Sequence, residues 1–226
     1  MSAYTMTWTR TLTLVAAAMV MAVAVTVSPT RLYAQTVSYT PGVLPDTWFS
    51  GGPDCAVFQQ DFQIHAYNDN FYILRESGCV HAEKPFLYLL FGQDKAILFD
   101  TGAGNNTDPT TGRVPNVVGA VNLVISQWLA RNNRQSIHLV VTHLHSHFDH
   151  IWGDNQFTGR PNTTFVPPGS VPALQSFFGI RHWPGDIVPY DLGQRVLDII
   201  PIPGHDATHI AVYDRQTGVL LTGDTL

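Results

Sequence analysis

The sequence has few charged residues, few cations and only two cysteines, and each shortage narrows the class of protein. Charged residues make up 13% of the 226 residues, and 12 Lys and Arg stand against 17 Asp and Glu. No run of like charges occurs, so the basic surface of a nucleic-acid-binding protein is missing and we expect no nucleic-acid partner. Repeats and low-complexity segments are also lacking. The 45% hydrophobic content therefore predicts an ordinary globular domain, or two at most.

The first 34 residues predict a secretory signal peptide. They contain Arg10 and Arg31 but no Asp or Glu, and the stretch 12–27 is largely apolar. We place cleavage after Ala34, a small residue. About 16 apolar residues fall short of the roughly 20 that span a bilayer, although an uncleaved anchor is the alternative. We expect a periplasmic or secreted protein with no stable membrane association after signal cleavage.

Cys55 and Cys79 are the only cysteines, and both lie in the amino-terminal part of the mature chain. An even pair in an oxidising compartment predicts a disulfide bond. Closing a loop of about 25 residues stabilises a domain by about 3.5 kcal/mol in the chain-entropy model. The alternative is a pair of buried free thiols.

The remaining sequence predicts an irregular arm at residues 35–60 and a domain of mixed strands and helices at 61–226. The arm is rich in Pro, Gly and Ser. Apolar runs with period two predict strands, and apolar positions recurring at three and four predict helices. The expected strands are 71–74, 85–91, 96–99, 137–141, 163–166, 196–202, 209–213 and 219–222, and the expected helices are 117–128 and 171–178. This alternation is typical of an α/β fold.

Histidines gather directly after the expected strand at 137–141. Four of the ten histidines of the chain fall within positions 143–150, far more than an even spread would place there. The segment from His145 to His150 reads HxHxDH. In an extended segment residues i and i+2 point the same way, so His145 and His147 can face one metal ion. Asp149 and His150 follow where the chain must turn, and they can address a second ion.

Two further ligand types come at strand ends, His205 in Pro-Gly-His and Asp224 in Gly-Asp. Together with HxHxDH and with Asp100-Thr101-Gly102, these motifs make the chain resemble the metallo-β-lactamase superfamily from about Phe71 to its last residue. The resemblance implies an αββα sandwich with metal ions at one edge, between the sheets.

The resemblance also implies the roles of the ligands. His145, His147 and His205 would hold the first ion, Asp149 and His150 the second, and Asp224 would bridge the two. Imidazole and carboxylate ligands suit two zinc ions, with iron or manganese possible. A metal-bound hydroxide would then attack a carbonyl group. Asp149 is the candidate catalytic residue of the chain itself.

Some motif residues allow more than one interpretation. Thr142-His143 suggests a second register in which His143 is a ligand, but only the register from His145 fits HxHxDH without a gap. The family supplies one more histidine beyond Gly-Asp, so we expect a C-terminal part missing after Leu226. His209 is a possible substitute, although a packed histidine is the more common case. Asp100 is expected to brace the site through hydrogen bonds.

Several aromatic residues and histidines have weaker signals. The segment 167–186, with Phe177, Phe178 and Trp183, forms either a pocket wall or ordinary packing, and Trp152 is another possible wall residue. Four histidines lack ligand spacing: His65, His81, His138 and His182.

These observations favour an exported metal-dependent hydrolase that acts on a small molecule with an ester, thioester or lactone bond. Asp224 argues against β-lactams, because β-lactam hydrolysers of this superfamily generally lack an acid there. A dinuclear zinc β-lactamase, an iron-dependent dioxygenase of the same fold and a binding module without turnover are the alternatives. The oligomeric state stays open.

Overall fold

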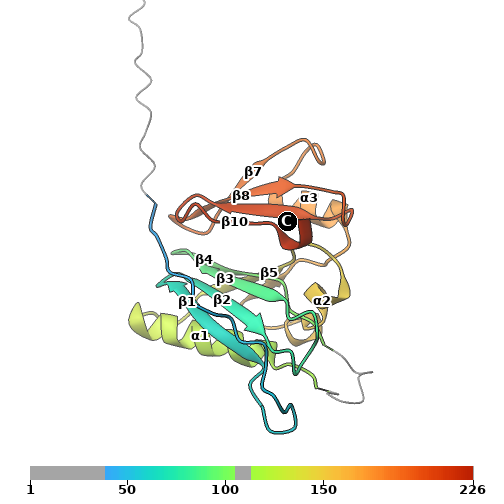
Figure 1. The fold of residues 1–226 in the computed structure, drawn as a ribbon. Coiled ribbons are helices and arrows are strands. Elements are labelled where there is room, and N and C mark those ends of the chain that lie inside the picture. Colours follow the sequence, from blue (N-terminus) through green and yellow to red (C-terminus); the bar gives the residue numbers. More distant parts are fainter. Residues whose placement is uncertain (1–38, 105–112, 226) are drawn as a thin grey trace, which may run out of the picture. The chain divides into compact units, whose positions relative to one another are not determined.

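Two β-sheets, one of six strands and one of four, form the centre of the structure (Figure 1). The computed structural model describes residues 39–104 and 113–225. These residues belong to one unit, Ser38–Leu226. The expected signal peptide at 1–34 lies outside the described residues and stays a prediction. Within the described ranges, no helix combines the length and apolar character needed to cross a membrane.

The first sheet contains its strands in sequence order. It runs antiparallel from β1 to β4, and β5 and β6 then join in parallel. Parallel neighbours need a crossover, and α1 provides it between β4 and β5. The strands are β1 (Phe62–Asn68), β2 (Phe71–Glu76), β3 (Phe86–Phe91), β4 (Lys95–Phe99), β5 (His138–Thr142) and β6 (Thr163–Phe165).

The second sheet is antiparallel throughout and has the order β10-β9-β8-β7. Each of its strands is therefore bonded to its neighbour in the sequence. The strands are β7 (Val188–Asp191), β8 (Val196–Pro201), β9 (Ile210–Asp214) and β10 (Leu220–Leu221).

Helix α1 (Val117–Arg131) covers the outer face of the first sheet. The Asn116 side chain caps it by accepting from the Gly119 N–H at 2.9 Å. Val117, Val121 and Val124 lie on its buried face, because residues three to four apart share one side of a helix. The shorter helices are α2 (Phe148–Ile151), α3 (Val171–Phe178) and the 3-10 turns η1 (Asp154–Gln156) and η2 (Gly223–Thr225).

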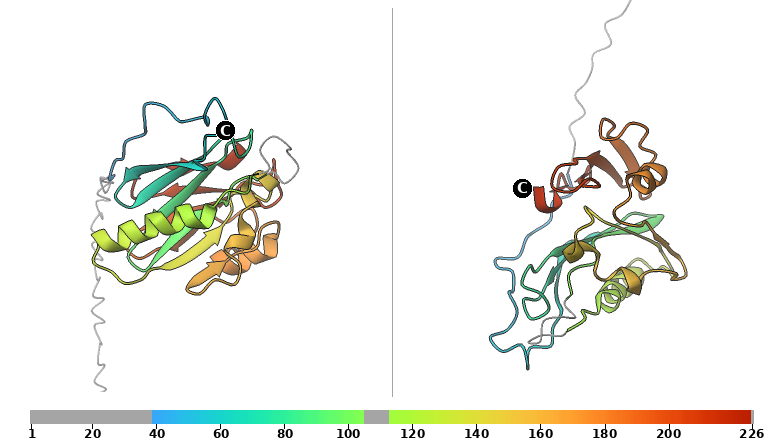
Figure 2. Two further views of the ribbon diagram at one scale, coloured as in Figure 1. Left: turned by 90° about the horizontal axis from the view of Figure 1, so that it is seen from below. Right: turned by 90° about the vertical axis from the view of Figure 1, so that its right-hand side faces the viewer.

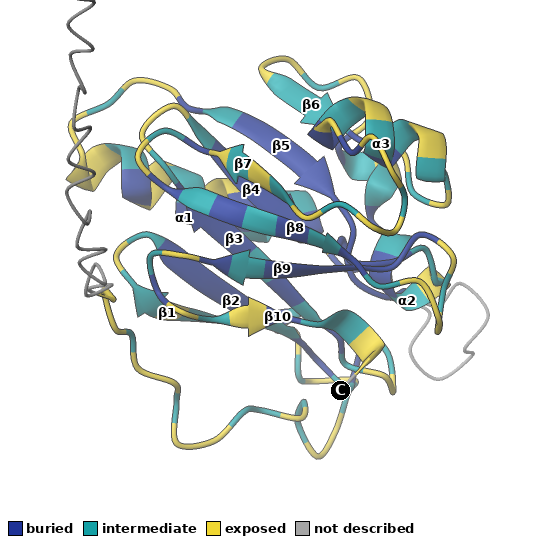
Figure 3. Cartoon of the chain, turned by 90° about the horizontal axis from the view of Figure 1, so that it is seen from above, coloured by how far each residue is buried: buried dark blue, intermediate teal, exposed yellow. Residues whose placement is uncertain are grey.

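Two apolar cores hold the layers together. One lies between α1 and the first sheet, and the other lies between the two sheets, where Ile97 and Phe99 pack with Ile199 and Val212. Figure 2 shows α1, the first sheet and the second sheet as successive layers, with α3 beside the second sheet. In Figure 3, β5 is mostly buried while β7 alternates with exposed residues. The layering confirms the expected α/β sandwich.

Every strand and helix expected from the sequence is present, but two strands were not expected. β1 (Phe62–Asn68) mixes polar and apolar residues at the sheet edge, and only its first residue is fully buried. β7 (Val188–Asp191) is also an edge strand and contains Pro189. Edge strands need no continuous apolar run and tolerate proline, so pattern alone identifies them poorly.

The predicted disulfide bond between Cys55 and Cys79 is present. It joins residues 39–61, which contain no helix or strand, to the β2–β3 loop. The same loop is fixed by backbone hydrogen bonds from Ser77 N–H to Asp61 O at 2.8 Å and from Gly78 N–H to Ser50 O at 3.0 Å. The connection between β2 and β3 is therefore held from outside as well as by its own strands.

Arg195 and Asp214 form an ion pair that is buried on both sides, with 2% and 1% of each residue exposed. Arg195 Nη2 lies 2.6 Å from Asp214 Oδ2 and its Nε lies 3.2 Å from Oδ1. Its Nη1 donates to Phe91 O at 3.2 Å and to Asn70 O at 2.5 Å. The guanidinium thus ties the β1–β2 turn and the end of β3 in the first sheet to the end of β9 in the second sheet.

Glu76 is a fully buried acid on β2, and burial raises its pKa to about 9. Its Oε2 accepts from the Ala103 N–H at 2.9 Å. Since the folded pKa lies above the ordinary value of 4.5, the proton stabilises the fold below pH 4.5, and this contribution is lost as the pH rises toward 9.

Replacing Glu76 with glutamine should remove this pH dependence. Relative to wild type, Glu76→Gln should gain at most about 1.4 kcal/mol of unfolding free energy for each pH unit between about pH 5.5 and 7.5. Urea unfolding at several pH values measures this, with the exposed Glu83→Gln as the control. A constant difference between Glu76→Gln and wild type would show that Glu76 is already ionised.

Candidate metal centre

The motif residues meet where strands of both sheets end. His145 to His150 follow β5, His205 follows β8 and Asp224 follows β10. β5 belongs to the first sheet while β8 and β10 belong to the second, so the site lies at one edge of the sandwich and draws on both halves.

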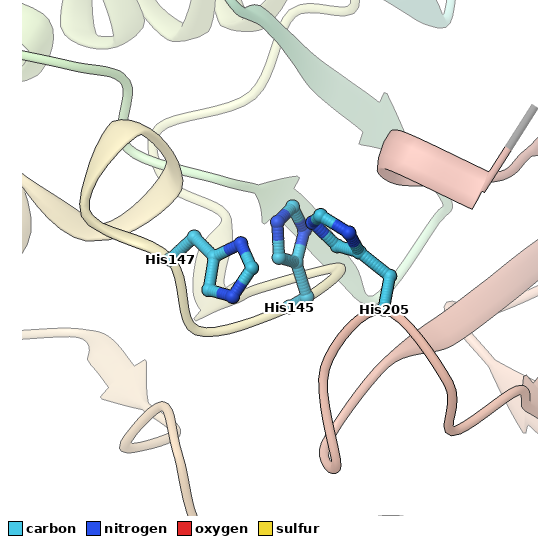
Figure 4. A group of neighbouring side chains, drawn as sticks. All are labelled: His145, His147 and His205. Carbon is cyan, nitrogen blue, oxygen red and sulfur yellow. The ribbon is translucent and has the colours of Figure 1, made fainter.

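Three imidazole rings form the first cluster (Figure 4). Ring centroids lie 4.7 Å apart for His145 and His147, 4.9 Å for His145 and His205, and 4.4 Å for His147 and His205. One nitrogen of each ring lies within 4.8 Å of the others, a spacing that allows a single ion to contact all three. His145 is buried, while 43% of the His147 side chain is exposed. The cluster therefore opens toward solvent on one side.

A second cluster shares His145 and adds His150 and Asp224. Asp224 Oδ1 lies 3.3 Å from His150 Nε2, and Oδ2 lies 3.6 Å from Nε2 of His145 and of His205. Asp149 Oδ2 lies 3.4 Å from His150 Nε2. One carboxylate of Asp224 thus has an oxygen toward each cluster, as a bridging ligand requires.

The buried state of His145 fits a metal ion. Among the described residues, neither of its ring nitrogens has a hydrogen-bond partner, and such a buried polar group costs free energy unless something binds it. Burial lowers the pKa of His145 to about 4, and the neighbouring His150 adds to this effect. The imidazole is therefore neutral at pH 7, the form that binds zinc or iron.

Asp100 fixes the orientation of His150. Its Oδ2 lies 2.8 Å from His150 Nδ1, and its Oδ1 accepts from the Leu144 N–H at 2.8 Å. Burial alone lowers the pKa of His150, but the carboxylates of Asp100, Asp149 and Asp224 outweigh it and raise the value to about 9. With Nδ1 engaged by Asp100, Nε2 faces the cluster. Asp100 thus braces the site, as expected.

Asp206 supports the first cluster from the other side. Its Oδ2 lies 3.9 Å from His147 Nε2 and accepts from Ser146 Oγ at 2.7 Å. Partial burial raises the pKa of Asp206, but hydrogen bonds from Thr208 and Ser146 outweigh this and lower it to about 2. Asp206 did not stand out in the sequence, although it directly follows the Pro-Gly-His motif.

His143 and His209 lie outside both clusters. His143 Nε2 pairs with Asp154 Oδ1 at 2.8 Å, whereas the histidines that come together are those of the register from His145. His209 stacks on His145 with centroids 4.8 Å apart and its Nε2 lies 2.9 Å from Thr222 O. His209 therefore packs against the clustered histidines without joining them.

The remaining histidines and the aromatic segment have other surroundings. Phe178 is buried in the core between the sheets, and Phe177 and Trp183 pack against that core, which favours packing over a pocket wall. The Trp152 ring lies against Gly104. None of four further histidines belongs to a cluster among the described residues: His65, His81, His138 and His182.

A cavity of about 190 Å³ adjoins His150 and Asp224, and the sequence did not indicate its other walls. Arg75, Phe86 and Tyr88 line it from β2 and β3. Burial raises the pKa of the Tyr88 hydroxyl to about 12, so that group is a neutral hydrogen-bond donor. The only feature of the sequence that could have indicated this wall is Arg75, a cation within the otherwise apolar run of β2.

Two sheets with a cluster of histidines and carboxylates at their shared edge define a class of proteins, and comparison with known proteins gives the same class. The family model described as metallo-beta-lactamase superfamily matches residues 84–226. The chain belongs to the metallo-β-lactamase superfamily.

Individual relatives are more distant. A hydroxyacylglutathione hydrolase of Rippkaea orientalis is 34% identical over 98 residues, covering 39% of this chain and 36% of that protein. One from Nitrosomonas eutropha is 25% identical over 167 residues, covering 73% and 49%. The chain thus spans between about a third and a half of the length of these curated relatives.

Among solved structures, a metallo-β-lactamase from Pontibacter korlensis is similar in fold. Its TM-score is 0.41 at 19% identity, and the match covers 69% of this chain and 67% of that one.

Proposed function

We propose that this protein is an exported, metal-dependent hydrolase that cleaves a carboxylic thioester or related ester. The observation that carries the proposal is the position of Asp224, whose two oxygens face histidines of both clusters. Hydroxyacylglutathione is a thioester, so the names of the curated relatives support this substrate class. The disulfide between Cys55 and Cys79 supports an oxidising compartment.

The residues of the chain would divide the work as follows. His145, His147 and His205 would hold one divalent cation, and Asp149 and His150 would hold a second, with Asp224 between them. Bound there, the cations supply a water-derived nucleophile at neutral pH and polarise the substrate carbonyl. Asp100 keeps the His150 ring oriented, and Asp206 places a negative charge 3.9 Å from His147. The exposed side of His147 and His205 leaves room for substrate to approach.

Metal content and hydrolysis test the proposal together. Zinc-loaded wild type should hold at least one ion per chain and hydrolyse at least one member of a panel of thioester, ester, lactone and β-lactam substrates. The variant His145→Ala/His147→Ala should lose both properties, because it removes two of three imidazoles of one cluster. His182→Ala, an exposed histidine outside the clusters, is the control.

Two results would contradict the proposal. Full metal occupancy in the double variant, measured by elemental analysis, would refute the ligand assignment. Absence of turnover across the panel at full metal loading would refute the hydrolase and favour a binding module or an iron-dependent oxygenase.

A further inference from the structure

The wall of the cavity beside the metal centre contains two cations, Arg75 and Lys84. Residues of β2 alternate in direction, so Arg75 shares a face with Phe71 and Ile73, which are buried between the sheets. The other residues on this face of β2 are apolar, so an arginine is unexpected at the position of Arg75. It sits at the end of the strand, paired with Phe86 of β3, on the same edge as the metal ligands.

The Arg75 side chain is held in place but incompletely bonded. Its guanidinium carbon lies 4.2 Å from the centroid of the Phe86 ring, which supports the group from one side. Its Nε is buried and, among the described residues, has no hydrogen-bond partner. A buried donor without a partner costs free energy unless a ligand accepts from it.

Lys84 comes from the β2–β3 loop, which the structure holds firmly. The disulfide at Cys79 and the hydrogen bond from Gly78 to Ser50 fix one arm of this loop, and Glu76 N–H to Pro85 O at 3.0 Å closes it. Exposed Glu83 is the one acid that this loop adds to the cavity. Two cations and one acid therefore line the cavity from β2 and the β2–β3 loop, and the acids of the candidate metal centre, Asp100, Asp149 and Asp224, also line it.

We propose that Arg75 and Lys84 form a subsite for a carboxylate group of the substrate, in the cavity that also adjoins His150 and Asp224. The proposal rests on the proposed hydrolase function and extends it to the substrate class, an anionic ester or thioester. The two oxygens of a carboxylate match the donors of a guanidinium. The neutral Tyr88 hydroxyl and the Phe86 ring line the same cavity and suit the short chain between the carboxylate and the scissile bond.

A binding experiment tests the subsite without relying on turnover. The zinc-loaded full chain is titrated with 4-phenylbutyrate and with neutral 4-phenylbutyramide, and dissociation constants are measured by calorimetry. Wild type should bind the carboxylate about tenfold or more tightly than the amide. In Arg75→Gln/Lys84→Gln this ratio should fall at least about fivefold.

The matched control is Arg134→Gln/Lys95→Gln, which removes the same charge. Lys95 begins β4, five residues before Asp100, and thus lies about 15 Å from the metal edge. This control should keep the wild-type ratio. Lys84→Gln alone, in a loop, and Arg75→Lys, which keeps the charge, cover the case in which the double variant does not fold. The first should lose about threefold of the preference, and the second should retain most of it.

Two outcomes overturn the subsite: wild type that binds both probes equally, or an Arg75→Gln/Lys84→Gln variant that keeps the full preference, in which case the metal ions alone recognise the carboxylate. Hydrolysis of the substrate panel described above, extended by a thioester that carries a carboxylate, is measured separately. If no substrate turns over at full zinc loading while the preference in binding depends on Arg75 and Lys84, the proposed function fails and the subsite stands.

Discussion

Replacing Asp224 with alanine should lower turnover by about two powers of ten or more, the order of magnitude that a mispositioned catalytic group costs. The physical reason is the position of its carboxylate, with Oδ1 3.3 Å from His150 and Oδ2 3.6 Å from His145. Without it, the two clusters of described residues are linked only through His145, the histidine that they share. The three imidazoles of His145, His147 and His205 should still hold one ion.

The measurement is kcat on the best substrate of the panel together with metal content by elemental analysis. Asp46→Ala, which removes an exposed acid of the N-terminal arm, is the control and should match wild type. If Asp224→Ala keeps wild-type turnover, Asp224 is not a bridge, and the reason for placing β-lactams below thioesters disappears with it.

Arg195→Ala should reduce the free energy of unfolding by about 3 to 5 kcal/mol, the largest stability effect that we expect from a single substitution. The substitution leaves the Asp214 carboxylate buried without its cation and removes the donor to Phe91 O and Asn70 O. An uncompensated buried charge costs far more than the pair itself contributes. Urea unfolding of wild type and variant gives the difference directly.

Arg215 offers a matched comparison, because it pairs with Asp198 at 2.6 Å but 53% of its side chain is exposed. Solvent screens such a pair, so Arg215→Ala should cost less than about 1 kcal/mol. Equal losses for Arg195→Ala and Arg215→Ala would show that burial does not decide the cost of breaking these pairs.

Much of the fold followed from periodicity in the sequence. The central strands of the first sheet are largely apolar because both of their faces are covered, one by α1 and one by the second sheet. Helix α1 has a continuous apolar face because that face packs on the sheet. β1 and β7 were missed because edge strands carry mixed residues. The Arg195–Asp214 pair was missed for a different reason: its members are 19 residues apart and no local pattern joins a lone arginine to a distant aspartate.

The residues of the candidate site were likewise predictable from the sequence only in part. His145, His147 and His150 were predictable because four candidate ligands, three histidines and one aspartate, fall within one short motif. Asp206 and Arg75 were not, since a single acid after a motif and a single cation in a strand have no spacing to identify them. Only the folded arrangement shows that Asp206 lies 3.9 Å from His147 and that Arg75 lines the cavity beside Asp224.

The strand order determines which long loops the chain must close to form the site, and each closure costs conformational entropy. In both sheets every hydrogen-bonded neighbour is also a neighbour along the chain, so the sheets close only short loops, apart from the crossovers to β5 and β6. The long loops are closed where the sheets meet, and His145 and His205, sixty positions apart in the sequence, meet there. Packing of the two sheets fixes these ends before any ligand arrives. The entropy cost of bringing the histidines together is therefore part of folding. When an ion binds, little of its binding free energy is needed to order the chain.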